Sequence, residues 1–346
     1  MLNDSIKPSC VMGNSSPVIF FCEAGPQTGF GHAGRCMALA AALREGFGRE
    51  SVFGFRGAPD AAKRIEDAGF KVIEVSDFNN WQFGTESAIV LDLRISLAHS
   101  FFERAKTENK MLVSIDDPTP NRLHCDLAFY PPVPQFHELD WSGFDGVIHR
   151  GWEFIPLRKE FRLPKKKKVK ASPPKVLVTM GASDPHRLTL RVLQALQSVP
   201  GQWRAEVVIG PMFNSLDKID RIAVEHGKQV KLLHDIKDMS RRMQECDAAI
   251  ASFGMTAYEL AACGVPQLLL CLSEDHACSA SALHASGAAV SLGKFDRISE
   301  QKLAAELQKF ISDQVALQSM TAKAAALGIG NGAMNIATRI EENIIH

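Results

Sequence analysis

The sequence predicts an α/β protein with two domains, each built on a doubly wound parallel sheet, that face each other across a cleft. Short apolar runs alternate with segments of helical periodicity, which indicates parallel βα units. This alternation stops near residue 130, in a stretch rich in proline and aromatic residues, and restarts at Lys175. The length of 346 residues agrees with two domains, because a domain has roughly 150 residues.

The first half is expected to contain strands at 18–22, 51–55, 71–75, 88–93 and 111–115. A helix from about His32 follows the first strand and places apolar residues on one face, which are Cys36, Leu39, Ala40 and Leu43. Between residues 130 and 175 we expect a break in the alternation. Its Lys165–Lys168 run is typical either of a solvated linker or of a patch that binds phosphate or lipid headgroups.

The second half repeats the pattern, with strands expected at 175–180, 205–209, 231–233, 248–251 and 267–272, a helix at 187–198 and a helical end at 299–345. We therefore expect a flexible extension at 1–16, an N-terminal Rossmann-like domain at 17–162, a linker at 163–174 and a C-terminal Rossmann-like domain at 175–346. In such a pair, ligands bind in the cleft, at the carboxyl ends of the strands.

Composition narrows the class of partner. Lys plus Arg and Asp plus Glu are equal at 39 each, so the chain lacks the basic field that favours nucleic acid, and a small molecule is the expected partner. Its 8 cysteines form no CxxC pair and no zinc-like cluster with histidine, which is typical of reduced core residues in a cytoplasmic protein. Neither a signal peptide nor a run of about 18 apolar residues is present, so no integral membrane segment is expected. The sequence carries no signal of oligomeric state.

A glycine-rich turn, TGFGHAGRC at residues 28–36, follows the first strand. It matches neither the GxxxxGK[ST] nor the GxGxxG phosphate loop. We expect His32 to stand at the start of a helix, with Arg35 one turn further on the same side. A neutral imidazole takes a proton from water near pH 7, and a helix N-terminus disfavours its cation, so His32 suits the role of a general base.

Acidic residues end two of the expected strands, at Asp92 and at Asp116–Asp117. Aspartate in these positions either caps a helix or turn, or projects into the cleft, and the sequence supports both interpretations.

Two small-residue segments follow strands in the second half. Met180–Asp184 is typical of a loop that lets a ligand approach the backbone. In Ser252–Glu259, Thr256 and Glu259 have the spacing of a capping box, so the segment is consistent with a well-capped short helix. The same helix N-terminus is also suited to bind a diphosphate, and the carboxylate of Glu259 to chelate a ribose diol.

Between residues 18 and 293 the chain contains several motifs in the order in which one enzyme family has them. It therefore resembles the UDP-2,4-diacetamido-2,4,6-trideoxy-β-L-altropyranose hydrolases of pseudaminic acid biosynthesis. Gly29–Cys36, with Leu39-Ala40, resembles the family's GxGHxxRC turn and helix. The other matching segments are Ser114–Asp117, Cys125–Leu127, Gly151–Phe161, Val176–Pro185 and Gly254–Pro266.

The resemblance implies the two-domain GT-B fold, shared with the transferase that adds N-acetylglucosamine in peptidoglycan synthesis. It also implies hydrolysis of a UDP-linked amino or deoxy sugar, without a metal or cofactor, in pseudaminic acid biosynthesis and flagellin glycosylation. His32 would be the base that activates water. The other sugar-side candidates are Gly29, Gly31, Arg35, Asp92 and Arg94, and the nucleotide-side candidates are Gly181, Ser183, Gly254, Met255, Thr256, Glu259, Asp275 and His276.

The chain departs from the family pattern at three places. Phe21–Glu23 replaces an R-x-D motif, Arg94 replaces the tyrosine of a D-x-Y motif, and Asp275-His276 replaces an Asn-Gln pair. Arg94 brings a permanent charge that favours a carboxylate or phosphate. Besides a hydrolase, the sequence is therefore consistent with a glycosyltransferase on the same scaffold and with a nucleotide-sugar binder without activity.

Overall fold

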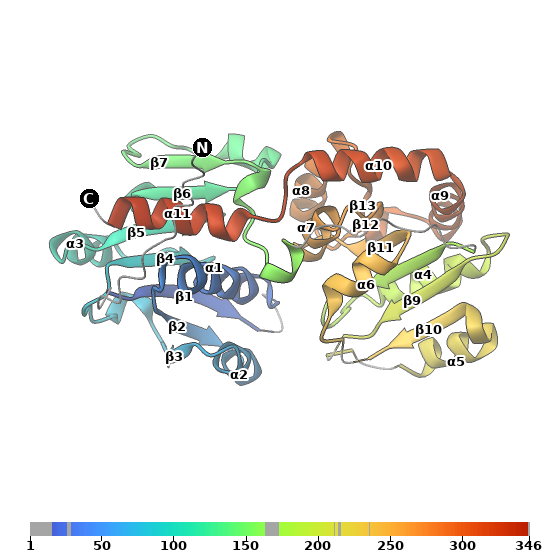
Figure 1. Ribbon diagram of the computed structural model, residues 1–346, viewed down its shortest axis with the longest axis horizontal. Coiled ribbons are helices and arrows are strands. Elements are labelled where there is room, and N and C mark those ends of the chain that lie inside the picture. The colour runs from blue at the N-terminus through green and yellow to red at the C-terminus, as the bar shows by residue number, and fades with distance from the viewer. Residues whose placement is uncertain are drawn as a thin grey trace, which may run out of the picture.

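Two parallel sheets, each covered by helices, form two lobes that lie side by side in the computed structural model (Figure 1). The structure describes residues 16–25, 29–162, 173–210, 212–213, 216–234 and 236–344. Of the expected extension at 1–16 and linker at 163–174, residues 1–15 and 163–172 lie outside this description, and so does the Lys165–Lys168 run.

The N-terminal lobe contains a seven-stranded parallel sheet in the order β3-β2-β1-β4-β5-β6-β7. Its strands are β1 (Val18–Ala24), β2 (Ser51–Gly57), β3 (Lys71–Glu74), β4 (Ala88–Asp92), β5 (Met111–Ile115), β6 (Leu127–Tyr130) and β7 (Val147–Arg150). The first five agree with the expected strands, whereas β6 and β7 were missed. Both have only four residues, and Val147 on the edge strand β7 is 51% exposed, so neither forms a long apolar run.

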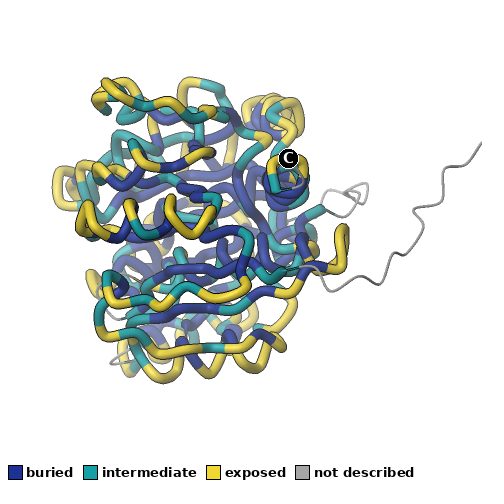
Figure 2. Tube along the Cα trace, turned by 90° about the vertical axis from the view of Figure 1, so that its left-hand side faces the viewer, coloured by how far each residue is buried: buried dark blue, intermediate teal, exposed yellow. Residues whose placement is uncertain are grey.

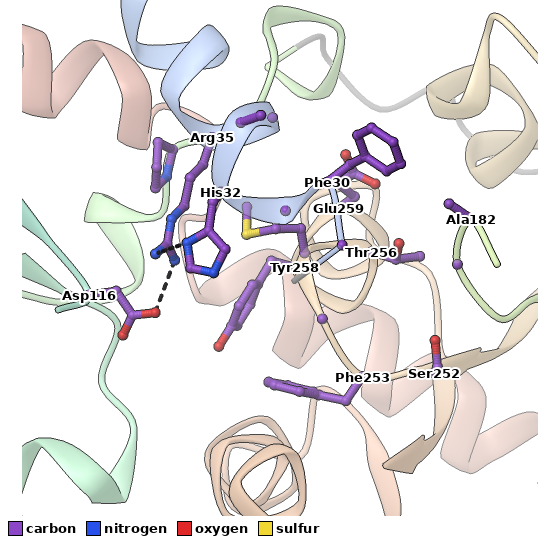
Figure 3. A pocket seen from close by; sticks show the side chains of 18 of the residues that line it. Phe30, His32, Arg35, Asp116, Ala182, Ser252, Phe253, Thr256, Tyr258 and Glu259 are labelled. Atoms are coloured by element: carbon purple, nitrogen blue, oxygen red, sulfur yellow. Dashed lines mark hydrogen bonds and ion pairs between the residues drawn. The ribbon is translucent and has the colours of Figure 1, made fainter. Parts of the chain in front are cut away.

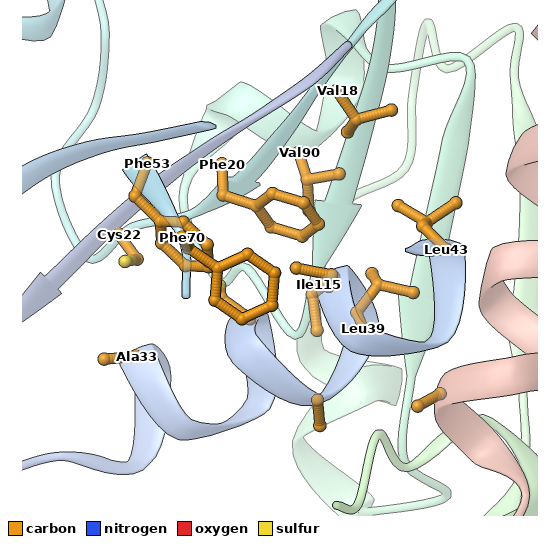
Figure 4. Packing of buried hydrophobic residues seen from close by; sticks show 14 of the residues in the cluster. Val18, Phe20, Cys22, Ala33, Leu39, Leu43, Phe53, Phe70, Val90 and Ile115 are labelled. Carbon is orange, nitrogen blue, oxygen red and sulfur yellow. The ribbon is translucent and has the colours of Figure 1, made fainter. Parts of the chain in front are cut away.

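Side chains of β1 alternate between two cores because successive residues of a strand point to opposite faces. Val18, Phe20 and Cys22 pack beneath helix α1 (Gly31–Phe47), together with Leu39 and Leu43 of that helix (Figure 4). Ile19 and Phe21 pack on the other face, against helix α3 (His99–Thr107). Helix α2 (Pro59–Asp67) follows β2. Burial on both faces explains why the central strands have nearly continuous apolar sequences.

The C-terminal lobe contains a six-stranded parallel sheet in the order β10-β9-β8-β11-β12-β13. The strands are β8 (Lys175–Thr179), β9 (Arg204–Val208), β10 (Val230–Leu233), β11 (Ala248–Ser252), β12 (Gln267–Cys271) and β13 (Val290–Lys294). The helices are α4 (Leu188–Gln197), α5 (Asp217–His226), α6 (Met239–Glu245), α7 (Met255–Ala262), α8 (Glu274–Ala285), α9 (Glu300–Ser312) and α10 (Gln314–Ala326). Only β13, which is partly exposed along its length, was not expected. Figure 2 shows how buried segments run through the interior beneath exposed outer turns.

The last helix, α11 (Gly332–Ile344), lies against α1 of the N-terminal lobe (Figure 1). Ala333, Ile336 and Ile340 belong to the core beneath α1. A buried ion pair joins Glu341 to Arg49. The expected second domain, 175–346, includes α11, but this helix packs on the N-terminal lobe. Periodicity identifies an amphipathic helix but does not identify the sheet that the helix covers.

Candidate functional site

A cavity of about 690 Å³ lies between the two lobes, at the carboxyl ends of the strands. Every site residue expected from the sequence lines it except Asp92, which lies behind His32. On the N-terminal side these are Gly29, Gly31, His32, Arg35 and Arg94, and on the C-terminal side Gly181, Ser183, Gly254, Met255, Thr256, Glu259, Asp275 and His276.

His32 is oriented by a buried carboxylate. It is the second residue of α1, and its Nδ1 lies 2.5 Å from Oδ1 of Asp92, the last residue of β4. Asp92 is 1% exposed, whereas the side chain of His32 is 15% exposed. An ionised carboxylate only accepts hydrogen bonds, so this contact assigns the proton to Nδ1 and leaves the lone pair of Nε2 available.

Arg35 completes the support behind His32. Its Nε and Nη2 donate hydrogen bonds of 2.5 and 2.6 Å to the two oxygens of Asp92, and its Nη1 donates one of 2.9 Å to Asp116. Burial by itself would raise the pKa of Asp92, but the positive charge of Arg35, followed by His32, lowers that pKa well below its ordinary value. Asp92 is therefore ionised at neutral pH, and its charge stabilises the imidazolium that forms when Nε2 takes a proton. The expectation that His32 is a general base considered only the helix N-terminus and did not include the charge of Asp92.

The structure distinguishes the two interpretations of the aspartates at the strand ends, which were capping of a turn and a role in the cleft. Asp92 and Asp116 bind side chains of the cleft, and Asp116 reaches Arg35 from a positive-φ conformation (φ +50°) that residues other than glycine rarely adopt. Asp117 instead accepts a hydrogen bond from the backbone N–H of Thr119 and so stabilises a turn. Arg94 donates a 3.0 Å hydrogen bond to the carbonyl of Asp116, and its side chain remains 41% exposed at the cavity.

Helix α7 presents an open N-terminus to the cavity. Its N-cap, Gly254, has φ +157° and ψ −160°, a conformation essentially restricted to glycine, and no side chain caps the helix. The capping-box interpretation of Thr256 and Glu259 is therefore wrong. The N–H groups of Met255 and Thr256 have no partner within the helix, because an α-helix leaves its first donors unpaired, and such groups attract anions.

Glu259 is paired with a residue of the segment that follows β7 and packs against the core of the C-terminal lobe. Its carboxylate accepts a 3.2 Å hydrogen bond from Arg158 and is 13% exposed. Burial raises the pKa of Glu259, and Arg158 opposes this shift without cancelling it. Arg158 lies in the Gly151–Phe161 segment, which the sequence singled out as a motif without assigning a site residue.

The other nucleotide-side candidates lie on two loops and on α8. Gly181, with φ +83°, follows β8 in the loop that also carries Ser183. Asp275 accepts hydrogen bonds of 2.9 and 3.0 Å, on its carbonyl and its carboxylate, from Gln135 of the opposite lobe. The backbone N–H of His276 donates to the N-cap Ser273, and its buried Nδ1 has no partner among the described residues.

Sequence reasoning missed Arg158, Gln135 and Tyr258. Tyr258 is three residues after Met255 on α7, so the helical spacing from an expected site residue was the one available signal. Among the described residues, no group of three or more His, Cys, Asp or Glu side chains is arranged to hold a metal ion. No helix in the described part of the chain is long and apolar enough to span a membrane.

No family model matches the chain. Among curated proteins, it is similar to the uncharacterized protein MJ1062 of Methanocaldococcus jannaschii, with 29% identity over 273 residues. That match covers 74% of this chain and 56% of the other, so the chain spans little more than half the length of this relative. The chain is also similar to the spore coat polysaccharide biosynthesis protein SpsG of Bacillus subtilis, with 23% identity over 93% of this chain and 97% of that protein.

Solved structures match the whole architecture. MurG of Acinetobacter baumannii has a TM-score of 0.65 at 14% identity and covers 94% of this chain and 99% of its own. HepE of Anabaena, solved with UDP-glucose, has a TM-score of 0.60 at 14% identity and the same coverage. MnaA of S. aureus, solved with UDP, has a TM-score of 0.62 at 11% identity, over 95% of this chain and 97% of its own. At these identities the likeness shows the fold: the chain has two parallel-sheet, Rossmann-like domains of the glycosyltransferase-like GT-B type.

Proposed function

We propose that the chain is an enzyme that hydrolyses a UDP-linked amino or deoxy sugar to the free sugar and UDP, in the biosynthesis of a nonulosonic acid such as pseudaminic acid. The GT-B architecture supports a sugar-nucleotide ligand, since HepE and MnaA were solved with UDP-glucose and UDP. The similarity to SpsG, a polysaccharide biosynthesis protein, supports a role in sugar metabolism. The finer assignment to hydrolysis rests on the residues of the cleft.

One observation carries the proposal. His32, which Asp92 orients from behind, and the open N-terminus of α7 belong to different lobes and line the same cavity. The lobes come close at this point. A side-chain Cβ placed on Gly31 would lie only 3.8 Å from Cγ of Met255. A diphosphate bound at α7 would therefore hold the attached sugar next to His32 (Figure 3).

The chemistry follows from these positions. Nε2 of His32 takes a proton from a water molecule, whose oxygen attacks the anomeric carbon of the sugar. The bond between this carbon and the diphosphate oxygen breaks, and UDP departs with the bonding electron pair. Asp92 stabilises the imidazolium, and the N–H groups of Met255 and Thr256 stabilise the charge that develops on the departing diphosphate.

The residues proposed to bind the nucleotide are also chosen from their positions in the cavity. Glu259 follows the diphosphate site by one helical turn, and its carboxylate suits the ribose hydroxyls because it accepts two hydrogen bonds. Arg158, in the segment that follows β7, holds the carboxylate in place. The flanking loop residues Gly181 and Ser183 allow the ligand to approach the backbone, and Asp275 and His276 also line the cavity.

The decisive experiment is incubation with a panel of UDP-, CMP- and GDP-sugars, with and without hydroxyl acceptors, followed by mass spectrometry. The expected products are free sugar and UDP in the absence of an acceptor. Product formation only in the presence of an acceptor would replace the proposal by a glycosyltransferase. Tight binding without any product would indicate a nucleotide-sugar binder.

A further inference from the structure

Tyr258 is a buried cavity residue whose hydroxyl group has no partner in the described protein. It lies on α7 directly before Glu259, lines the cavity and is 7% exposed. The hydroxyl of Tyr258 is affected by burial and by the charges of neighbouring groups. No described residue forms a hydrogen bond with it. Because its oxygen is not fully buried, the hydroxyl opens onto the cavity and is available to a ligand there.

The ring of Tyr258 is held by two aromatic neighbours. It packs at 5.7 Å, edge to face, against Phe253, and its centroid lies 6.3 Å from that of Trp152. In Figure 3 the ring leaves α7 beneath His32, and its hydroxyl end points toward the space beside Asp116. The hydroxyl therefore lies below His32, on the side of Asp116.

The protonation state of the hydroxyl limits what it binds. Burial, followed by the negative charge of Asp116, raises the pKa of Tyr258 well above its ordinary value. The group is therefore a neutral hydroxyl at physiological pH, which both donates and accepts a hydrogen bond. Such a group pairs well with the hydroxyl or acylamino substituents of a sugar.

We propose that Tyr258 binds the sugar part of the substrate: its hydroxyl hydrogen-bonds a hydroxyl or acylamino substituent and so positions the anomeric carbon in front of the water held by His32. This inference rests on the proposed function for the place of the sugar between α7 and His32. No residue that the structure describes pairs with this hydroxyl, and the ligand supplies a partner for it.

The chain has 2 tyrosines, which allows a matched comparison. Tyr258→Phe removes the cavity hydroxyl and retains the ring that packs against Phe253. Tyr130→Phe is the control, because the hydroxyl of Tyr130 donates a 2.6 Å hydrogen bond to the carbonyl of Asp117, inside the protein. Calorimetric dissociation constants for UDP, UDP-glucose and UDP-N-acetylglucosamine, together with melting temperatures, are measured for both variants.

We expect Tyr258→Phe to weaken the binding of at least one UDP-sugar roughly three- to tenfold. Its dissociation constant for UDP and its melting temperature should remain those of the wild type. Tyr130→Phe should do the reverse, with a lower melting temperature and unchanged dissociation constants.

Equal weakening of UDP and UDP-sugars by Tyr258→Phe, or weakening of neither, would overturn the inference. So would a wild type that binds both UDP-sugars no tighter than UDP. The binding readout separates this inference from the proposed hydrolysis. Suppose that Tyr258→Phe no longer binds a UDP-sugar more tightly than UDP, while the wild type cleaves no UDP-sugar. The proposed hydrolysis is then wrong, and the proposed contact between Tyr258 and the sugar is retained. If a UDP-sugar is cleaved equally well by both proteins, with equal affinity, only the contact at Tyr258 fails.

Discussion

Replacing Asp92 with asparagine removes the charge behind His32 and retains the shape of the side chain. One amide oxygen must then replace two carboxylate oxygens, which accept hydrogen bonds from His32 Nδ1 and from Nε and Nη2 of Arg35. If the oxygen faces the guanidinium, the amide nitrogen faces His32 and donates to Nδ1. The proton of the imidazole then lies on Nε2, which can no longer accept a proton from water.

The expected loss follows from the two roles of the carboxylate. General base catalysis contributes about 10²- to 10⁴-fold, so kcat for sugar release should fall by this factor. Removing one partner of a buried ion pair costs about 3–5 kcal/mol, and we expect about 3 kcal/mol because Asp116 still pairs with Arg35. Binding of UDP should be unchanged, because Asp92 lies outside the nucleotide side of the cavity.

The assay is sugar release under single-turnover conditions, with calorimetry for UDP and urea denaturation for stability. Asp117→Asn is the matched control, because Asp117 is equally buried, binds a turn and does not contact His32. Burial raises the pKa of Asp117, so a neutral amide should cost little there. Wild-type kcat in Asp92→Asn would refute the reasoning, and so would an equal loss in both variants.

The pH dependence of stability gives the same pair a second test. The pKa of Asp92 is lowered in the folded protein, so its ion pair contributes stability above the unfolded value of about 3.9, and this contribution is lost as the pH falls below that value. The difference in the free energy of unfolding between wild type and Asp92→Asn should therefore stay constant from neutral pH down to about 5 and shrink as the pH falls further, through about 4. A difference that stays constant down to pH 3 would contradict the assignment of an ionised Asp92.

Three further substitutions test the remaining parts of the structure. His32→Ala should abolish sugar release while UDP binds as in the wild type, and full activity in calorimetrically normal protein would eliminate His32 as the base. Glu259→Ala should weaken UDP binding by roughly tenfold, whereas an unchanged dissociation constant would remove Glu259 from the ribose site. Glu341→Gln should lower the free energy of unfolding in urea by about 3 kcal/mol, since it removes the carboxylate charge that neutralises the buried Arg49. A loss near zero would show that apolar packing alone attaches α11.

Most of the architecture was accessible from local patterns. Apolar runs such as 18–22 and 88–93 correspond to central strands buried on both faces, where burial requires apolar side chains at every position. The edge strand β7 was missed because it is partly exposed and needs no such run, and β6 was missed because its four residues are too short a run to stand out. Helix α11 was recognised as helical, but its place on the N-terminal lobe depends on a return of the chain that no local pattern encodes.

The site divides in the same way. The sequence by itself determined which residues end strands or begin helices, and in a doubly wound sheet this is enough to bring His32, Arg94 and Gly254 to one cleft. Only the tertiary structure decided that Asp92 orients His32, that Arg158 pairs with Glu259 and that the hydroxyl of Tyr258 opens onto the cavity without a partner among the described residues. The physical reason is that strand order and helix position follow from periodic local interactions, whereas the partner of a polar side chain depends on distances between elements that are far apart in the chain.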